Sequence, residues 1–377
     1  MNKNLLAAIA TLVGTTIGAG ILGIPYVIAK AGFLTGLFVI IVIGLSILFV
    51  NLALGEIILR TPGNHQLTGY ASIYYGKTGK YILTFAMVFG IYGALTAYLI
   101  GEGTALSYIF NGNITFFTLI FFAIASLILL FGLKAIEKSE VLFASVTLFL
   151  ILIIVMVSFN FIIFDNLKTF DIKNVLIPYG VIFFAFLAIP AIPEMKEELI
   201  RNKKLLKKAI VIGSLIPFLA YVLFALVVVG VSGDKTSEIA TIGLGKFLGE
   251  KTLIIGNLFA IFSMAAAFLG LGFALMEMYH RDYKINKNLS WFLTCFVPLG
   301  LVMLGINNFI GTISLVGSLV AGIDGILIIS MWLKAKKFGK RKPEYSINLP
   351  PILIMIAILV FLLALYLSFV NFSRIII

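Results

Sequence analysis

The sequence predicts an all-α protein that crosses a membrane eleven times, and two observations carry this prediction. The first is composition: the chain of 377 residues is 61% hydrophobic, only 12% of its residues are charged, and its mean hydropathy is +1.15. This composition exceeds what a water-soluble core needs and is typical of a chain whose solvent is the bilayer. The second is that the apolar residues fall into eleven runs, each long enough to span a bilayer as a helix.

The eleven runs divide the chain almost completely, and no polar block between them is long enough for a soluble domain. We therefore expect a single transmembrane domain over residues 1–377, located as a multi-pass protein in the cell membrane. The predicted spans are 5–30, 33–58, 81–108, 114–133, 140–163, 174–194, 208–231, 252–279, 289–305, 309–333 and 348–370.

The basic residues predict how these spans are oriented. When the N-terminus is placed in the cytoplasm, only seven of the 28 Lys and Arg residues lie on the outer side: Lys30, Lys168, Lys173, Lys235, Lys246, Lys251 and Arg374. The other 21 lie on the inner side, which agrees with the positive-inside rule. Eleven spans then place the C-terminus outside. Because the inner lysines face anionic headgroups, the net charge of +12 predicts contact with membrane lipids and not with nucleic acid.

Two of the eleven spans are interrupted by residues that disfavour a helix. Span one contains GTTIGAGILGIP at 14–25, and span six contains PYGVIFFAFLAIPAIP at 178–193. Because these spans are five apart, two halves built around them would have opposite orientations in the membrane. We therefore expect two inverted repeats of five helices each, at about 5–163 and 174–333, followed by an extra helix at about 348–370. Two independent proline kinks are the alternative interpretation.

The two interruptions predict a binding site for an α-amino acid. A helix break leaves amides and carbonyls without helical partners, and in a membrane such groups must be buried in protein or line a cavity. The half-helix that begins near Ile21 presents free amides and a positive dipole end, which suit a carboxylate. Gly18 and Gly20 would let a ligand approach the backbone closely. Carbonyls freed before this break, and others near Ala185 and Phe186 in span six, suit an ammonium group.

The same segments resemble a known family of transporters. GTTIGAGILGIPYVIAKAGF (14–33) is similar to the first-span signature of the amino acid/auxin permease family, and FFAFLAIPAIPEMKEEL (183–199) is similar to its sixth span. TGYASIYYGKTGKYI (68–82) resembles its first cytoplasmic loop, and YGALTAYLIGEGTALSYI (92–109) resembles its third span. This family belongs to the amino acid–polyamine–organocation superfamily. The resemblance therefore implies the LeuT-type fold, with discontinuous helices 1 and 6 broken at the substrate site.

The resemblance also implies which residues bind the substrate. The residues that match the carboxylate-binding segment of span one are Gly18, Ala19, Gly20, Ile21 and Leu22, with Thr15 and Thr16 just before them. The residues that match the span-six turn, which supplies carbonyls and an aromatic gate, are Phe184, Ala185, Phe186 and Leu187. Tyr92 and Phe268 complete the predicted set, and Tyr98 is a further candidate, although an aromatic residue on a membrane helix can also serve packing alone.

Two alanines in span eight bear on the coupling ion. Related aromatic amino acid permeases carry Thr and Ser at the positions of Ala266 and Ala267, and such hydroxyls are the usual span-eight sodium ligands of this fold. Alanine offers no oxygen, so Ser263 remains as a weak sodium alternative. We therefore predict coupling to protons, with Asp324 as the deepest carboxyl in the membrane and Glu102 as a second candidate. A role for Asp324 in helix packing alone is the alternative.

The remaining titratable residues predict gating and exclude catalysis. Three acidic residues near inner helix ends, Glu56, Glu194 and Glu277, are candidates for gating ion pairs. Two histidines and one cysteine form no catalytic or metal-binding cluster in the sequence, so we predict no enzyme, no metal site and no cofactor. A GxxxxGK phosphate-binding motif is also absent from the sequence, which speaks against ATP-driven pumping.

These observations together predict a secondary active transporter for a neutral or aromatic amino acid that works by alternating access as a proton symporter. The alternatives are a sodium-coupled symporter, or a membrane sensor that binds an amino acid without net transport. The sequence sets no oligomeric state.

Overall fold

The computed structural model describes residues 3–131, 133–306 and 308–376, and these ranges form helices and no strand. Within them, nine helices are long and apolar enough to cross a membrane, and a bent pair of helices at the N-terminus makes a tenth crossing. A further apolar helix, Lys287–Met303, has 17 residues, which is the lower limit for a crossing. If this helix crosses, the total equals the predicted eleven.

The helices follow one another with short connections. In chain order they are α1 (Lys3–Thr16), α2 (Gly20–Ala31), α3 (Phe33–Arg60), α4 (Leu67–Phe110), α5 (Ile114–Phe131), α6 (Leu133–Phe159), α7 (Tyr179–Phe186), α8 (Ile192–Glu198), α9 (Leu206–Ser232), α10 (Ala240–Leu248), α11 (Glu250–Glu277), α12 (Lys287–Met303), α13 (Phe309–Phe338) and α14 (Pro351–Ile376). Short 3-10 turns and one π-helical turn lie between some of them.

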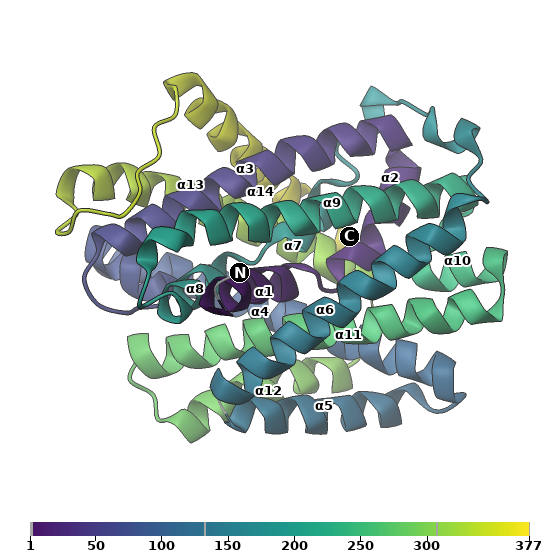
Figure 1. Ribbon diagram of the computed structural model, residues 1–377, viewed down its shortest axis with the longest axis horizontal. Helices are drawn as coiled ribbons and strands as arrows, with labels where there is room; N and C mark the ends of the chain where they lie inside the picture. Colours follow the sequence, from purple (N-terminus) through teal and green to yellow (C-terminus); the bar gives the residue numbers. More distant parts are fainter. Residues whose placement is uncertain (1–2, 132, 307, 377) are drawn as a thin grey trace.

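Helices of the two interrupted spans occupy the middle of the molecule. In Figure 1, α3 and α9 run across the upper part, α5 and α12 run across the lower part, and α1, α7 and α8 lie between them. Nearly all of the segment Tyr179–Glu198, which contains α7 and α8, is buried inside the protein. Because interrupted helices expose backbone polar groups, this central position keeps those groups away from lipid.

Loops that we assign to the same side of the membrane contact each other. On the predicted inner side, the Arg341 amide donates to the Arg60 carbonyl at 3.1 Å. On the predicted outer side, the Leu34 amide donates to the Thr169 carbonyl at 3.0 Å. These contacts agree with the predicted alternation of the loops, whereas the cytoplasmic position of the N-terminus stays a prediction.

Two segments that we expected to be loops contain helix. Helix α4 begins at Leu67, well before the predicted start of span three at 81, and it turns sharply at Gly76, where φ is 62° and ψ is −150°. Only glycine adopts such a conformation readily. Gly76 therefore lets the chain turn from an inner helix directly into the membrane-spanning helix, with no loop between them. Helix α10 likewise forms within the predicted loop 232–251, because its apolar face packs against α11.

The predicted topology can be tested by cysteine labelling in a Cys295→Ser background, since Cys295 is buried and is the only native cysteine. Lys342 and Lys168 are both exposed and lie in loops assigned to opposite sides. In intact cells, we expect a membrane-impermeant maleimide to label Lys168→Cys and to leave Lys342→Cys unlabelled until the cells are permeabilised. Labelling of Lys342→Cys in intact cells would contradict the predicted orientation.

Candidate functional site

The break in span one lies between Thr16 and Gly20. Helix α1 ends at Thr16, α2 begins at Gly20, and the two helices are bent by 52° relative to each other. The amide of Ile21 donates to the Gly18 carbonyl at 3.4 Å and the amide of Leu22 donates to the Ala19 carbonyl at 3.1 Å. These two predicted carboxylate donors are therefore already used within their own turn.

The free amides belong to two other residues of the predicted segment. Among the described residues, the amides of Ala19 and Gly20 have no hydrogen-bond acceptor. The side-chain hydroxyl of Thr15 is also buried without a partner there, whereas that of Thr16 donates to the Leu12 carbonyl of its own helix. A carboxylate at this break would thus meet two backbone amides at a helix N-terminus and one free hydroxyl.

The break in span six lies at Leu187 and Ala188. Helix α7 ends at Phe186, and the next two residues leave the helical conformation, with ψ values of 84° and 22°. The chain then forms a 3-10 turn, η3 (Ile189–Ala191), followed by α8. Pro190 and Pro193 stand at the starts of these two elements, where a missing N–H costs no helical hydrogen bond. The prolines therefore restart the helix after the break.

The two breaks touch each other through Gly20. A Cβ atom added to Gly20 would lie 2.4 Å from the Cα atom of Ala185, so only glycine allows this approach of the two spans. Our expectation that Gly20 leaves room for a ligand is therefore not met, because the backbone of span six fills that room. Gly18 has a different surrounding: an added Cβ would lie 2.8 Å from the Tyr98 hydroxyl and 2.8 Å from the Ala267 Cβ.

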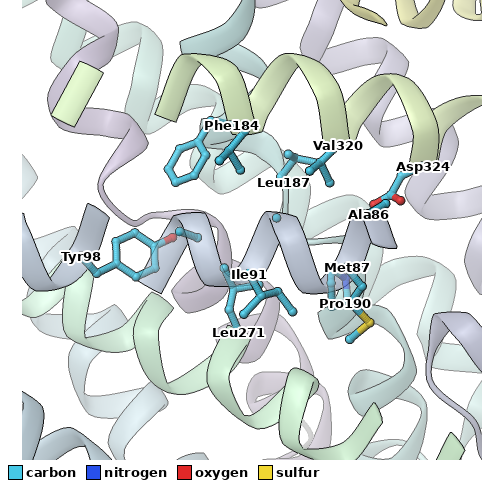
Figure 2. A pocket seen from close by; sticks show the side chains of 13 residues that line it. Ala86, Met87, Ile91, Tyr98, Phe184, Leu187, Pro190, Leu271, Val320 and Asp324 are labelled. Carbon is cyan, nitrogen blue, oxygen red and sulfur yellow. The ribbon is translucent and has the colours of Figure 1, made fainter. Parts of the chain in front are cut away.

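A cavity begins beside the break in span six and extends between α4 and α13. Its walls are mainly apolar, and its two polar side chains, Tyr98 and Asp324, stand toward opposite ends in Figure 2, with Phe184 and Leu187 between them. Asp324 is only 3% exposed, and its Oδ1 atom has no hydrogen-bond partner among the described residues. The remaining lining residues are Ala86, Met87, Gly90, Ile91, Ala94, Pro190, Leu271, Val316 and Val320.

Two aromatic residues of the predicted set lie elsewhere. The Tyr92 hydroxyl is 2.8 Å from the Tyr279 hydroxyl and 3.1 Å from the Leu293 carbonyl, and its side chain does not line the cavity. Phe268 is fully buried and packs edge-on against Phe121. Of the two span-three tyrosines, the structure therefore brings Tyr98 to the breaks and places Tyr92 in a different contact.

Comparison with known proteins shows the family of this chain. Residues 1–369 match the tryptophan/tyrosine permease family. The chain belongs to this family. The predicted amino acid permease class is thereby confirmed, while membership of the amino acid–polyamine–organocation superfamily stays a prediction. The permease is a multi-pass protein of the cell membrane, and it is not an enzyme, in agreement with both predictions.

Two curated relatives resemble this permease over most of their length. Tyrosine-specific transport system 1 of Haemophilus influenzae is 28% identical over 368 residues, and the match covers 91% of each chain. Glutamine transporter 2 of Aliivibrio fischeri is 24% identical over 367 residues, and the match covers 93% of each chain. Family membership and these relatives support amino acid transport as the class of function.

A solved structure establishes the fold of this permease. The crystal structure of MhsT in complex with L-phenylalanine superposes with a TM-score of 0.72 at 15% sequence identity, covering 97% of this chain and 98% of that chain. At this identity the likeness speaks to fold alone, and the fold is of the LeuT type. The inverted relation of the two repeats stays a prediction.

The two candidate carboxyls of the permease face different cavities. Asp324 lines the cavity beside the breaks, whereas Glu102 lines a separate apolar cavity that includes Phe121, Ile124 and Leu269. Both carboxylate oxygens of Glu102 are buried without a hydrogen-bond partner among the described residues. Of these two carboxyls, only Asp324 thus lines the cavity that begins beside the break in span six.

Two residues of span eight, Ser263 and Ala267, bear on a sodium ion beside Gly18. Ser263 donates its hydroxyl to the Ala260 carbonyl of its own helix at 2.9 Å. Ala267 faces Gly18 with a methyl group. Among the described residues, no group of three or more His, Cys, Asp or Glu side chains is arranged to hold a metal ion.

The predicted gating residues of the permease have different surroundings. Glu277 forms an ion pair with Arg281, which also pairs with Glu197 at the end of α8. This pair of contacts links the inner end of span six to the π-helical turn η6 (Met278–Asp282) that follows α11. Glu194 lies buried on α8 one turn earlier.

Glu56 has a structural surrounding at the inner end of α3. It accepts hydrogen bonds from the Trp332 indole at 2.9 Å and from the Ile347 amide at 2.9 Å, and it pairs with Arg60 at 2.7 Å. These contacts hold the connection between α13 and α14 against α3. Glu56 therefore fits an anchor better than a gate.

The position of Tyr98 beside Gly18 predicts an effect on substrate binding that Tyr92 does not share. We expect Tyr98→Phe to weaken amino acid binding by roughly tenfold, because the substrate loses a hydrogen bond at the break. The matched variant Tyr92→Phe removes a hydroxyl from the same helix, and we expect it to lower thermal stability and to leave affinity unchanged. Binding of a radiolabelled amino acid to purified protein measures both, and equal affinities for the two variants would contradict this assignment.

Proposed function

We propose that this permease is a secondary active transporter that carries a neutral or aromatic amino acid together with a proton by alternating access. The observation that carries this proposal is the position of Asp324, a buried carboxyl in the wall of the cavity that begins at the break in span six. Ionisable residues inside membrane-spanning helices commonly serve proton or substrate pathways. An amino acid bound at the breaks and a proton on Asp324 would thus occupy one connected site.

The chemistry of the breaks supports an α-amino acid as substrate. The amides of Ala19 and Gly20 and the hydroxyl of Thr15 provide donors for a carboxylate. The carbonyls of Ala185 and Phe186 each accept one hydrogen bond within the protein, so each keeps a lone pair that can accept a hydrogen bond from an ammonium. The cavity walls are apolar, so they suit an uncharged side chain. The names of the two curated relatives, one tyrosine-specific and one a glutamine transporter, fit this class of substrate.

The contacts of Arg281 support a gate at the inner side. Arg281 pairs with Glu197 on α8 and with Glu277 on α11, so it joins the inner half of span six to span eight. In alternating access the substrate leaves on the inner side only if this connection opens. Arg281 is exposed, and ion pairs that face solvent can break and re-form at modest free-energy cost, which suits a gate.

The proposal is tested by uptake into proteoliposomes of the purified permease, with a panel of radiolabelled amino acids. An inward proton gradient and an inward sodium gradient are imposed in separate experiments. We expect the proton gradient to drive accumulation of a neutral or aromatic amino acid, and the sodium gradient to have no effect. Uptake that requires sodium and ignores the pH gradient would contradict proton coupling.

Asp324→Asn tests the role of the carboxyl directly, because asparagine keeps the size of the side chain but cannot titrate. We expect this variant to lose proton-driven accumulation by about tenfold or more and to keep exchange of internal for external substrate, which needs no net proton movement. Glu102→Gln is the matched control, since Glu102 is equally buried but faces another cavity. Accumulation at the wild-type level in Asp324→Asn would eliminate Asp324 as the proton carrier.

A further inference from the structure

A tyrosine on α9 connects the two helix breaks. The hydroxyl of Tyr221 lies 2.7 Å from the carbonyl oxygen of Thr16 and 2.6 Å from that of Ala185. Thr16 is the last residue of α1, and Ala185 is the last residue but one of α7. A single side chain therefore contacts the carbonyl ends of both half-helices, one from span one and one from span six.

The packing around Tyr221 fixes its hydroxyl in this place. The side chain is fully buried, and its ring packs edge-on against Phe186, with ring centroids 5.0 Å apart. The same two segments also meet where Gly20 contacts Ala185. The hydroxyl and the glycine contact thus both hold the two breaks together.

Two helix C-terminal ends that lie close together place two partial negative charges side by side, and a positive charge or a hydrogen-bond donor between them is stabilising. The C-terminal end of a helix carries partial negative charge, and carbonyls at such ends in broken transporter helices coordinate cations. Here both carbonyls contact one neutral hydroxyl, whose single hydrogen can be donated to only one of them at a time. The Thr16 carbonyl also accepts from the Gly18 amide at 3.0 Å. The second carbonyl lies within contact distance of the hydroxyl oxygen but lacks a hydrogen from it.

We propose that Tyr221 is a positioning residue whose hydroxyl occupies the place of a cation between the Thr16 and Ala185 carbonyls. In this arrangement the protein supplies the donor that orders both breaks, and substrate binding needs no inorganic cation there. Removal of the hydroxyl opens a site of two carbonyl oxygens that a hard cation such as sodium can enter. The part of this inference that concerns substrate affinity rests on the proposed function, whereas the part that concerns sodium does not.

The test compares Tyr221→Phe with Tyr345→Phe. In both variants phenylalanine keeps the ring and removes one hydroxyl that donates to a backbone carbonyl. Tyr345 is the matched control because its hydroxyl donates to the Leu52 carbonyl at 2.7 Å, in the inner connection between α13 and α14. Melting temperature is measured in sodium chloride and in choline chloride of equal ionic strength. We expect sodium to raise the melting temperature of Tyr221→Phe, because a ligand that binds only the folded state stabilises it. We expect the melting temperatures of wild type and of Tyr345→Phe to be the same in both salts.

Substrate binding provides the second measurement. In choline chloride we expect Tyr221→Phe to bind its amino acid roughly tenfold or more weakly than wild type, since a buried carbonyl loses its partner, and sodium to restore part of this loss. Tyr345→Phe should bind as wild type does. Wild-type affinity in Tyr221→Phe, or identical behaviour of this variant in sodium and choline, would overturn the inference.

A third variant keeps the inference testable if Tyr221→Phe fails to fold. In Tyr221→Lys an ammonium of similar reach supplies three donors and a positive charge to the two carbonyls. We expect this variant to melt at the same temperature in sodium and in choline, and stabilisation by sodium would contradict the inference. If wild type binds no amino acid of the panel, the proposed function fails, while the melting experiments still decide the role of the Tyr221 hydroxyl.

Discussion

The requirement that no backbone polar group faces lipid without a partner governs the architecture of this permease. Each helix break frees amides and carbonyls, and lipid supplies neither donors nor acceptors. The structure meets this requirement by placing both breaks at its centre and pressing them against each other at Gly20 and Ala185. The long helices around them provide the enclosure (Figure 1). The proposed substrate site is thus the place where the fold gathers the backbone groups that the two breaks free.

The same requirement explains why the site contains so few polar side chains. Backbone amides and carbonyls already present a donor set and an acceptor set, so the walls can be apolar and can select a side chain by shape. Polar side chains appear where they act on the breaks or on the cavity: Tyr98 beside Gly18, Tyr221 between the two carbonyls, and Asp324 farther along the wall. In the proposed mechanism, proton movement and substrate recognition would therefore depend on different atoms of one site.

The sequence predicts the membrane class and the spans, because its apolar runs are long enough to cross a bilayer. It also predicts the location of both breaks, because glycines and prolines inside apolar runs have only a few structural uses. It does not predict the details of the site. Tyr92 and Tyr98 are six residues apart, so they point about 120° apart on a helix, and only the position of α4 against the breaks decides between them. Tyr221 carries no motif, and the pairing of its hydroxyl with Thr16 and Ala185 depends on contacts far apart in the chain. The sequence also does not show which amides of the predicted segment are free, because only the structure shows that the turn uses those of Ile21 and Leu22.

The contact between Gly20 and Ala185 limits how this protein can evolve. Most tight contacts between helices involve two side chains, and a larger residue on one helix can be compensated by a smaller residue on the other. At this contact an added Cβ on position 20 would lie 2.4 Å from a backbone Cα atom and 2.5 Å from the Ala185 Cβ. Replacing Ala185 by glycine would remove the second clash but not the first. No side-chain substitution at Ala185 could therefore make room for a larger residue at position 20. Glycine is required there because the backbones of the two spans lie so close together.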